Sequence, residues 1–224
     1  MLKLAFLLAS ISILLGSSAK NMLPNIQAHC TKPSTITLTF DDGVSENLKS
    51  LLDILNRENV KATFFVIGNT LQNPYKRKIL TKAYIDGHTI ANHTWTHPRL
   101  ARLTAQQIEL EIRNTQNGIN QIGRSKRLFF RPPYGEINQK IYSTITKLGY
   151  TVVLWNLDSK DWNLKIKKNQ IWGNITKNTN QKHSYILLQH DRRLESIELV
   201  SDFIKYAKMS GFAIVPLDEC LSAL

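Results

Sequence analysis

The chain has 224 residues, of which 42% are hydrophobic, and it carries a formal net charge of +12. This hydrophobic content excludes an intrinsically disordered chain, and the length suits one domain of barrel or sandwich size. The basic residues are scattered and no nucleic-acid-binding motif is present, so we expect no nucleic-acid partner. A positive net charge attracts the protein to anionic surfaces.

The first residues have the layout of a secretory signal peptide. Lys3 gives a positive start, residues 4–15 are almost wholly apolar, and residues 16–19 are small. We therefore predict a signal peptide at 1–19 and a secreted protein, or one in the periplasm or associated with the cell envelope. The apolar run is short for a bilayer span, so an uncleaved anchor is the alternative and no stable span is expected after cleavage.

Residues 20–34 form a polar lead-in, after which strand-like and helix-like segments alternate. The strand-like runs lie near 35–40, 62–67, 88–92, 127–130, 150–155, 184–189 and 212–215. The helix-like segments lie at 46–58, 74–86, 104–122, 138–148, 167–179 and 195–209. This alternation predicts an α/β fold with a parallel sheet, a distorted (β/α)7–8 barrel of the TIM type in one domain over residues 35–224. A monomer is the default expectation.

Residues suited to chemistry fall where the predicted strands end. They are Asp41 and Asp42 after the first strand, His93 and His97 after the third, Arg131 after the fourth, Asp158 and Asp161 after the fifth, and His190 after the sixth. In a TIM-type barrel this rim carries the active site. The alternative for the first pair is a simple turn, because Asp-Gly is a common turn signal.

His93 and His97 are four residues apart, like the paired ligands of many zinc sites. Two imidazoles and one carboxylate suit Zn²⁺ with an open position, and mixed nitrogen and oxygen ligands also tolerate Co²⁺, Ni²⁺, Mn²⁺ or Fe²⁺. Arg131 can keep a carboxylate ionised, and His190 can act as an acid if a carboxylate holds it protonated. The alternatives are a rigid loop with a salt bridge for the arginine and a structural role for each histidine.

Five segments then point to one family. They are residues 39–43 (TFDDG), 93–97 (HTWTH), 131–135 (RPPYG), 158–162 (DSKDW) and 187–191 (LLQHD). In this order they resemble the motifs of the polysaccharide deacetylase family with the NodB homology domain, carbohydrate esterase family 4. The resemblance covers roughly residues 35–218.

The resemblance implies a role for each matching residue. Asp42, His93 and His97 would bind a divalent metal, usually zinc. Asp41 would be the general base, paired with Arg131, and His190 the general acid, tuned by Asp161. Tyr134 would give a backbone N–H to the oxyanion, and Trp162 and Leu188 would line the pocket for the acetyl methyl group. Gln189 departs from the family pattern, in which this position is commonly apolar, and leaves the shape of that pocket open.

The expected function is hydrolysis of linear amides (EC 3.5.1.-), the removal of N-acetyl groups from an acetylated glycan by metal-bound water that Asp41 activates. Peptidoglycan, chitin oligomers or an exported glycan are the expected substrates. The alternatives are an O-acetyl xylan esterase or small-amide hydrolase of the same family, and a non-catalytic glycan-binding wall protein. Cys30 and Cys220, near the two ends of the mature chain, can form one disulfide or remain as two thiols.

Overall fold

The computed structural model describes Leu23 and residues 26–222, so the expected signal peptide lies outside the described residues. The strands are β1 (Ile26–Gln27), β2 (Thr35–Gly43), β3 (Thr63–Val66), β4 (Thr89–Asn92), β5 (Phe129–Phe130), β6 (Thr151–Val153), β7 (Leu157–Asp158), β8 (Tyr185–His190) and β9 (Ala213–Ile214). The α-helices are α2 (Leu48–Arg57), α3 (Pro74–Ile85), α4 (Ala105–Asn120), α5 (Gln139–Lys147), α6 (Lys168–Thr176), α7 (Leu194–Met209) and α8 (Leu217–Cys220). Short 3-10 helices are η1 (Gly68–Gln72), η2 (Leu100–Arg102) and η3 (Pro133–Gly135).

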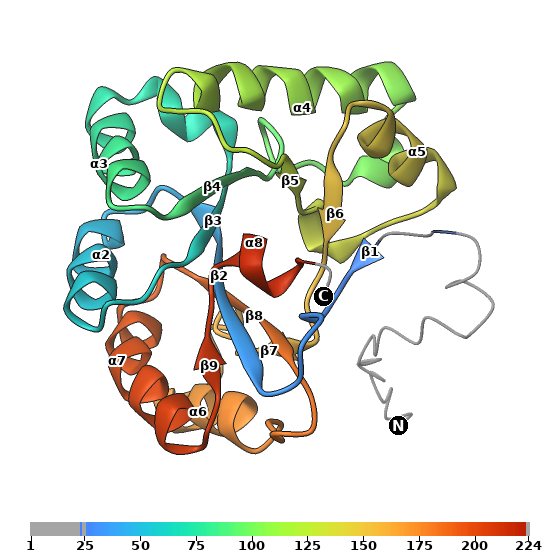
Figure 1. Ribbon diagram of the computed structural model, residues 1–224. Coiled ribbons are helices and arrows are strands. Elements are labelled where there is room, and N and C mark those ends of the chain that lie inside the picture. The colour runs from blue at the N-terminus through green and yellow to red at the C-terminus, as the bar shows by residue number, and fades with distance from the viewer. Residues whose placement is uncertain (1–22, 24–25, 223–224) are drawn as a thin grey trace, which may run out of the picture.

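The strands form one nine-stranded sheet that curls round, with most of the helices on its outside (Figure 1). The hydrogen-bonded order is β1-β6-β5-β4-β3-β2-β8-β7, with β9 also paired to β2, and every pair is parallel. Each predicted strand-like run overlaps a strand, so the predicted single-domain α/β fold with a barrel-like sheet is confirmed. The barrel is distorted, since the order ends at β1 and β7, which are not paired with each other in the described part of the chain.

Apart from the 3-10 helices, three short elements were not predicted. β1 lies inside the expected lead-in and pairs with β6, β7 follows β6 after a short turn, and α8 ends the described chain. Two-residue strands and a four-residue helix are too short to show hydrophobic periodicity, so only their tertiary partners define them.

The predicted helices form for the reasons that their sequences suggest. Four leucines of α2, at 48, 51, 52 and 55, share one face and are all buried against the sheet. Thr104 caps α4: its side chain accepts from the N–H of Gln107, and the Gln107 side chain accepts from the Thr104 N–H. These signals fix the helices that cover the outside of the barrel.

The two faces of the sheet belong to different parts of the core. Phe64 packs with the outer helices, whereas its neighbour Phe65 points to the barrel interior and packs with Leu217 of α8. A disulfide joins Cys30 to Cys220, with the two Cα atoms 4.5 Å apart and a sequence separation of 190. In the chain-entropy model a loop of this size contributes about 5 kcal/mol to stability.

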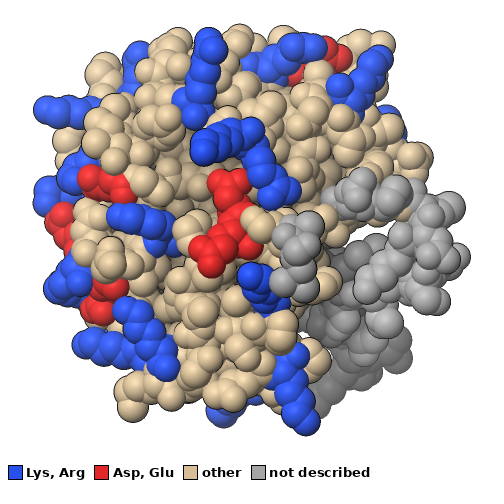
Figure 2. Space-filling view, viewed as in Figure 1, with Lys and Arg blue, Asp and Glu red and all other residues tan. Residues whose placement is uncertain are grey.

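Charge is spread over the surface. Figure 2 shows Lys and Arg side chains distributed over the face that it presents, with acidic side chains near its centre. Within the described residues, no helix combines the length and the apolar character that crossing a bilayer requires.

Candidate active site

The two neighbouring aspartates reach the same site because β2 is irregular where they occur. Asp41 pairs with Phe65 and Gly43 with Val66, so Asp42 is an extra residue between two paired positions. Its φ of 66° is left-handed, which ordinary strand residues avoid. The bulge breaks the strict alternation of side chains along β2, and both carboxylates therefore face the open rim of the sheet.

His93 and His97 lie in a tight loop that follows β4. Thr94 and His97 have φ values of 68° and 60°. The Thr94 N–H donates to the Asn92 side chain at 3.0 Å, and the His97 N–H donates to Thr94 Oγ1 at 3.0 Å. These local bonds hold the backbone in a conformation that costs energy for non-glycine residues and that is typical of functional sites.

Three side chains converge as a candidate metal site. Ligand atoms of Asp42, His93 and His97 all lie within 4.8 Å of one another. The Asp42 Oδ1 atom is 3.5 Å from His93 Nε2 and 3.3 Å from His97 Nε2. His93 Nδ1 lies 2.7 Å from the Arg131 carbonyl oxygen, which only accepts, so Nδ1 carries the proton and Nε2 presents its lone pair to the site.

The donor set fits a divalent cation. Asp42 Oδ1 is buried and has no hydrogen-bond partner among the described residues. Burial raises the pKa of Asp42, but its contacts with His93 and His97 outweigh this and hold the pKa below the usual range. Burial, reinforced by the neighbouring His93, lowers the pKa of His97 to about 4, which leaves its imidazole neutral as a ligand must be.

A fourth residue, Glu111 of α4, holds the histidine loop in place. Its Oε2 accepts from the backbone N–H groups of Trp95 and Thr96, each at 2.8 Å, and its Oε1 accepts from Thr96 Oγ1 at 2.9 Å. Sequence reasoning missed this residue, since a glutamate on an amphipathic helix looks like an ordinary surface charge. Nothing in the sequence pattern indicates that its carboxylate reaches a loop outside its own helix.

Arg131 is a buried cation that orients Asp41. Its side chain is fully buried, and its Nη1 donates to Asp41 Oδ1 at 2.7 Å and to Thr39 Oγ1 at 2.8 Å. Further bonds run from Nε and Nη2 to the backbone carbonyl oxygens of residues 153 and 154. The guanidinium also stacks 4.1 Å from the ring centroid of Phe65. With Oδ1 held in this way, Asp41 Oδ2 faces the candidate metal site and lies 3.8 Å from His93 Nε2.

His190 lies at the end of β8, in register with Asp41 on β2. Its Nδ1 is 2.7 Å from Asp161 Oδ1, and its backbone N–H donates to Asp161 Oδ2 at 2.9 Å. Ser196 Oγ donates to the same Oδ2 at 2.6 Å, a contact that sequence reasoning also missed. Burial alone lowers the pKa of His190, but the hydrogen bond and charge of Asp161 raise it to about 9, so the ring is protonated at neutral pH.

The other aspartate of this segment, Asp158, does not contact His190. It accepts instead from the Lys160 N–H at 2.7 Å and from Trp162 Nε1 at 3.4 Å. Trp162 is 57% exposed, while Leu188 is buried on the same face of β8 as His190. Both residues expected to line the acetyl pocket therefore lie next to the Asp161–His190 pair, one at its surface and one beneath it.

Tyr134 lies on the opposite wall, in the η3 turn after Arg131. Its φ of 60° is left-handed, and its ring meets the His97 ring edge-on with 4.7 Å between centroids. The Arg99 guanidinium stacks on the same ring at 4.5 Å. The turn is thus held against the histidine loop.

Gln189 does not enter the site. It lies in register with Phe40, and strand alternation places its side chain on the face of β8 opposite to Leu188 and His190. The side chain is buried, and neither amide atom has a hydrogen-bond partner in the described part of the chain. Gln189, the departure from the family pattern, therefore lies on the face of the sheet that points away from the site.

Comparison with known proteins places the chain in a family. A family model described as polysaccharide deacetylase matches residues 28–153. The chain belongs to the polysaccharide deacetylase family. It is similar to a peptidoglycan-N-acetylglucosamine deacetylase, PgdA, of Listeria monocytogenes, with 33% identity over 189 residues that make up 82% of this chain and 38% of that protein. It is also similar to a chitin deacetylase of Amylomyces rouxii, with 37% identity over 134 residues, 59% of this chain and 31% of that protein.

The fold similarity extends over most of the described chain. The structure of the chitin deacetylase from Colletotrichum lindemuthianum superposes with a TM-score of 0.80 and 28% identity, covering 88% of this chain and 91% of that one. The chain spans only about a third of the length of the two curated relatives above, 38% of PgdA and 31% of the Amylomyces rouxii chitin deacetylase.

Proposed function

We propose that the protein is a metal-dependent hydrolase that removes N-acetyl groups from a polysaccharide containing N-acetylglucosamine. One observation supports the proposal: the candidate metal ligands Asp42, His93 and His97 lie close together at the rim of the sheet. The same rim carries Asp41, which Arg131 binds, and His190, which Asp161 binds. Amide hydrolysis needs a base and an acid in such an arrangement.

The residues Asp42, His93 and His97 would hold the cation, with Zn²⁺ the ion that their nitrogen and oxygen donors suit best. A divalent cation bound there supplies Lewis acidity, which makes water more acidic and polarises a carbonyl group. The role of the surrounding residues is then to place the acetamide and to move protons.

Asp41 is the proposed general base. Arg131 binds its Oδ1, while Oδ2 faces the candidate metal ligands and can take a proton from the attacking water. The oxygen of that water bonds to the acetamide carbon. The backbone N–H of Tyr134 is proposed to donate to the oxyanion that forms.

His190 is the proposed general acid. Asp161 binds its Nδ1, which leaves the Nε2 proton for the leaving nitrogen as the C–N bond breaks. The products are acetate and a free amine on the sugar. Trp162 and Leu188 supply apolar surface beside this imidazole, which suits the methyl group of an acetamide.

The substrate class follows from the relatives, which are named as chitin and peptidoglycan deacetylases. Both polymers contain N-acetylglucosamine. We propose that the protein acts on such a glycan outside the cytoplasm, as the predicted signal peptide implies.

The decisive experiment is mass spectrometry of chitin oligomers and peptidoglycan fragments incubated with the purified protein, with and without EDTA. Each deacetylation replaces an acetyl group by a hydrogen atom, and we expect the mass of the glycan to fall by that difference. EDTA should prevent this change. Asp41→Asn should still bind metal but lose turnover. The control Asp53→Asn, at an exposed residue of α2 that pairs with Lys49, should behave as the wild type. Acetate release from acetyl xylan alone would favour the esterase alternative, and glycan that is bound but unchanged with or without EDTA would favour a binding protein.

A further inference from the structure

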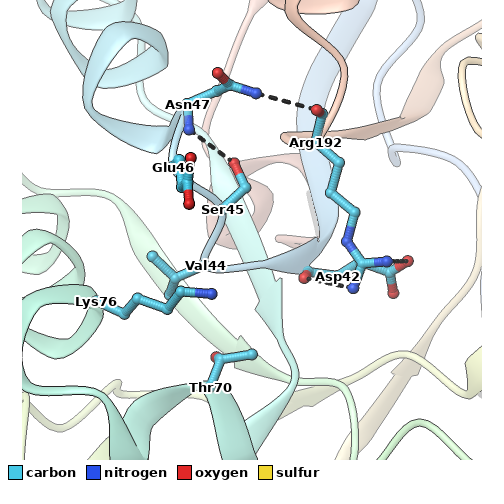
Figure 3. A pocket seen from close by; sticks show the side chains of 8 residues that line it. All are labelled: Asp42, Val44, Ser45, Glu46, Asn47, Thr70, Lys76 and Arg192. Atoms are coloured by element: carbon cyan, nitrogen blue, oxygen red, sulfur yellow. Dashed lines mark hydrogen bonds and ion pairs between the residues drawn. The ribbon is translucent and has the colours of Figure 1, made fainter.

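We propose that the pocket beside the candidate metal site binds a carboxylate group of the glycan. This carboxylate would lie on or next to a sugar that neighbours the one being deacetylated. This inference rests on the proposed function, which it narrows to acidic glycans. The pocket has a volume of about 390 Å³, in the range of small-ligand sites. It is lined by Asp42, Val44, Ser45, Glu46, Asn47, Thr70, Lys76 and Arg192 (Figure 3).

The pocket borders the candidate metal site, because the two share a residue. Asp42, a proposed metal ligand, forms one of its walls. A group bound there would therefore belong to the same substrate molecule as the acetamide, on a neighbouring sugar or substituent.

Two cations from different elements face this space. Arg192, from the turn between β8 and α7, lies beside Asp42, and the ammonium end of Lys76 from α3 points into the pocket (Figure 3). The Lys76 ammonium group forms no ion pair or hydrogen bond with any residue that the structure describes, and its backbone N–H donates to the Asn73 side chain. Arg192 Nη1 lies 3.8 Å from Asp42 Oδ2, its nearest carboxylate, and its side chain is 60% exposed.

The balance of charge favours an anion. Asp42 would give its negative charge to the metal cation, so it would no longer neutralise Arg192. Glu46 remains as one exposed acidic side chain at the rim, against the two cations. A guanidinium and a carboxylate match in geometry and can form paired, charge-assisted hydrogen bonds.

The backbone that carries Arg192 is fixed before any ligand binds. Asn47 Nδ2 donates to the Arg192 carbonyl oxygen at 3.0 Å, and Ser45 Oγ donates to the Asp191 carbonyl oxygen at 2.7 Å. The Ser45 N–H also donates to Asp191 Oδ2 at 2.9 Å. The two loops that form the pocket are thus tied together, and the guanidinium itself is placed beside Asp42, since its Nη2 donates to the Asp42 carbonyl oxygen at 3.4 Å.

Equilibrium binding tests the inference without depending on turnover. The zinc-loaded protein carrying Asp41→Asn, which does not consume substrate, would be titrated calorimetrically with three oligosaccharides of equal length. One is a neutral chitin oligomer, one carries the lactyl carboxylate of N-acetylmuramic acid, and one carries a uronic acid. We expect at least a tenfold preference for a carboxylate-bearing oligomer, and the preferred one identifies the source of the carboxylate.

Substitutions then locate the preference. Arg192→Gln and Lys76→Gln should each reduce the ratio of charged to neutral affinity about three- to tenfold, whereas Lys78→Gln, an exposed control on the same helix, should leave it unchanged. Equal binding of charged and neutral oligomers by the parent protein, or an equal loss of both affinities in Arg192→Gln, would overturn the inference. Lack of acetate release by the protein with Asp41 intact would contradict the proposed function alone, because the binding preference is measured separately.

Discussion

Glu111 offers a direct test of how the histidine loop is built. The substitution Glu111→Gln keeps the length of the side chain and removes its charge. In the structure this carboxylate accepts from two backbone N–H groups and one hydroxyl of residues 95 and 96, between the two histidine ligands. The change should therefore weaken metal binding, although Glu111 does not contact the metal group itself.

The size of the effect follows from those bonds. A hydrogen bond to a charged acceptor contributes about 1.5–3 kcal/mol and one to a neutral acceptor about 0.5–1.5 kcal/mol. Weakening the two backbone bonds by about 1 kcal/mol each gives about 2 kcal/mol, which corresponds to about a 30-fold loss of zinc affinity if all of it falls on the ligand conformation of the loop. Residues that orient metal ligands in this way typically contribute about 10–100-fold to affinity.

Zinc affinity would be measured by competition with a chromogenic chelator, alongside urea unfolding of the metal-free protein. The matched control is Glu109→Gln on the same helix, because among the described residues Glu109 pairs only with Arg113, at the surface. Such exposed pairs contribute little, about 0–1 kcal/mol, so the control should change neither zinc affinity nor stability appreciably. A Glu111→Gln protein that loses stability but binds zinc as tightly as the wild type would refute the reasoning, since the clamp would then serve the fold alone.

Three further changes test other parts of the structure. Asp161→Asn should lower kcat and move the alkaline limit of activity from about 9 toward the ordinary histidine pKa of 6.5, because His190 acts as an acid only while protonated; a pH–rate profile measures both, and an unchanged limit would contradict the pairing. Cys220→Ser should reduce the free energy of unfolding by about 5 kcal/mol, seen as a lower urea midpoint that reductant does not lower further. Gln189→Met should increase the free energy of unfolding by about 1–3 kcal/mol, because it removes a buried amide without a described partner. Urea unfolding measures this as a higher midpoint, and a lower midpoint would show that the amide has a hydrogen-bond partner.

Local sequence signals determined the elements that carry the fold. The four leucines of α2 and the Thr104–Gln107 capping box define their helices through interactions within one segment. Strands that alternate with such helices leave few topologies other than a parallel, barrel-like sheet. Because the carboxyl ends of parallel strands share one edge, the sequence alone also predicted that Asp42, His93, His97 and His190 would lie on a common rim.

Only the tertiary structure decided the contacts that depend on register and on distant partners. The bulge at Asp42 turns two adjacent carboxylates to one side, and no residue type announces it. The family resemblance pointed to Asp161 rather than Asp158 as the partner of His190, but the contact itself forms because the loop after β7 folds back. Glu111 and Arg192 have the composition of surface charges, and they gain their places at the site because α4 and the β8–α7 turn pack beside loops far away in sequence. Such long-range contacts leave no periodic pattern in the chain, which is the physical reason that the sequence does not reveal them.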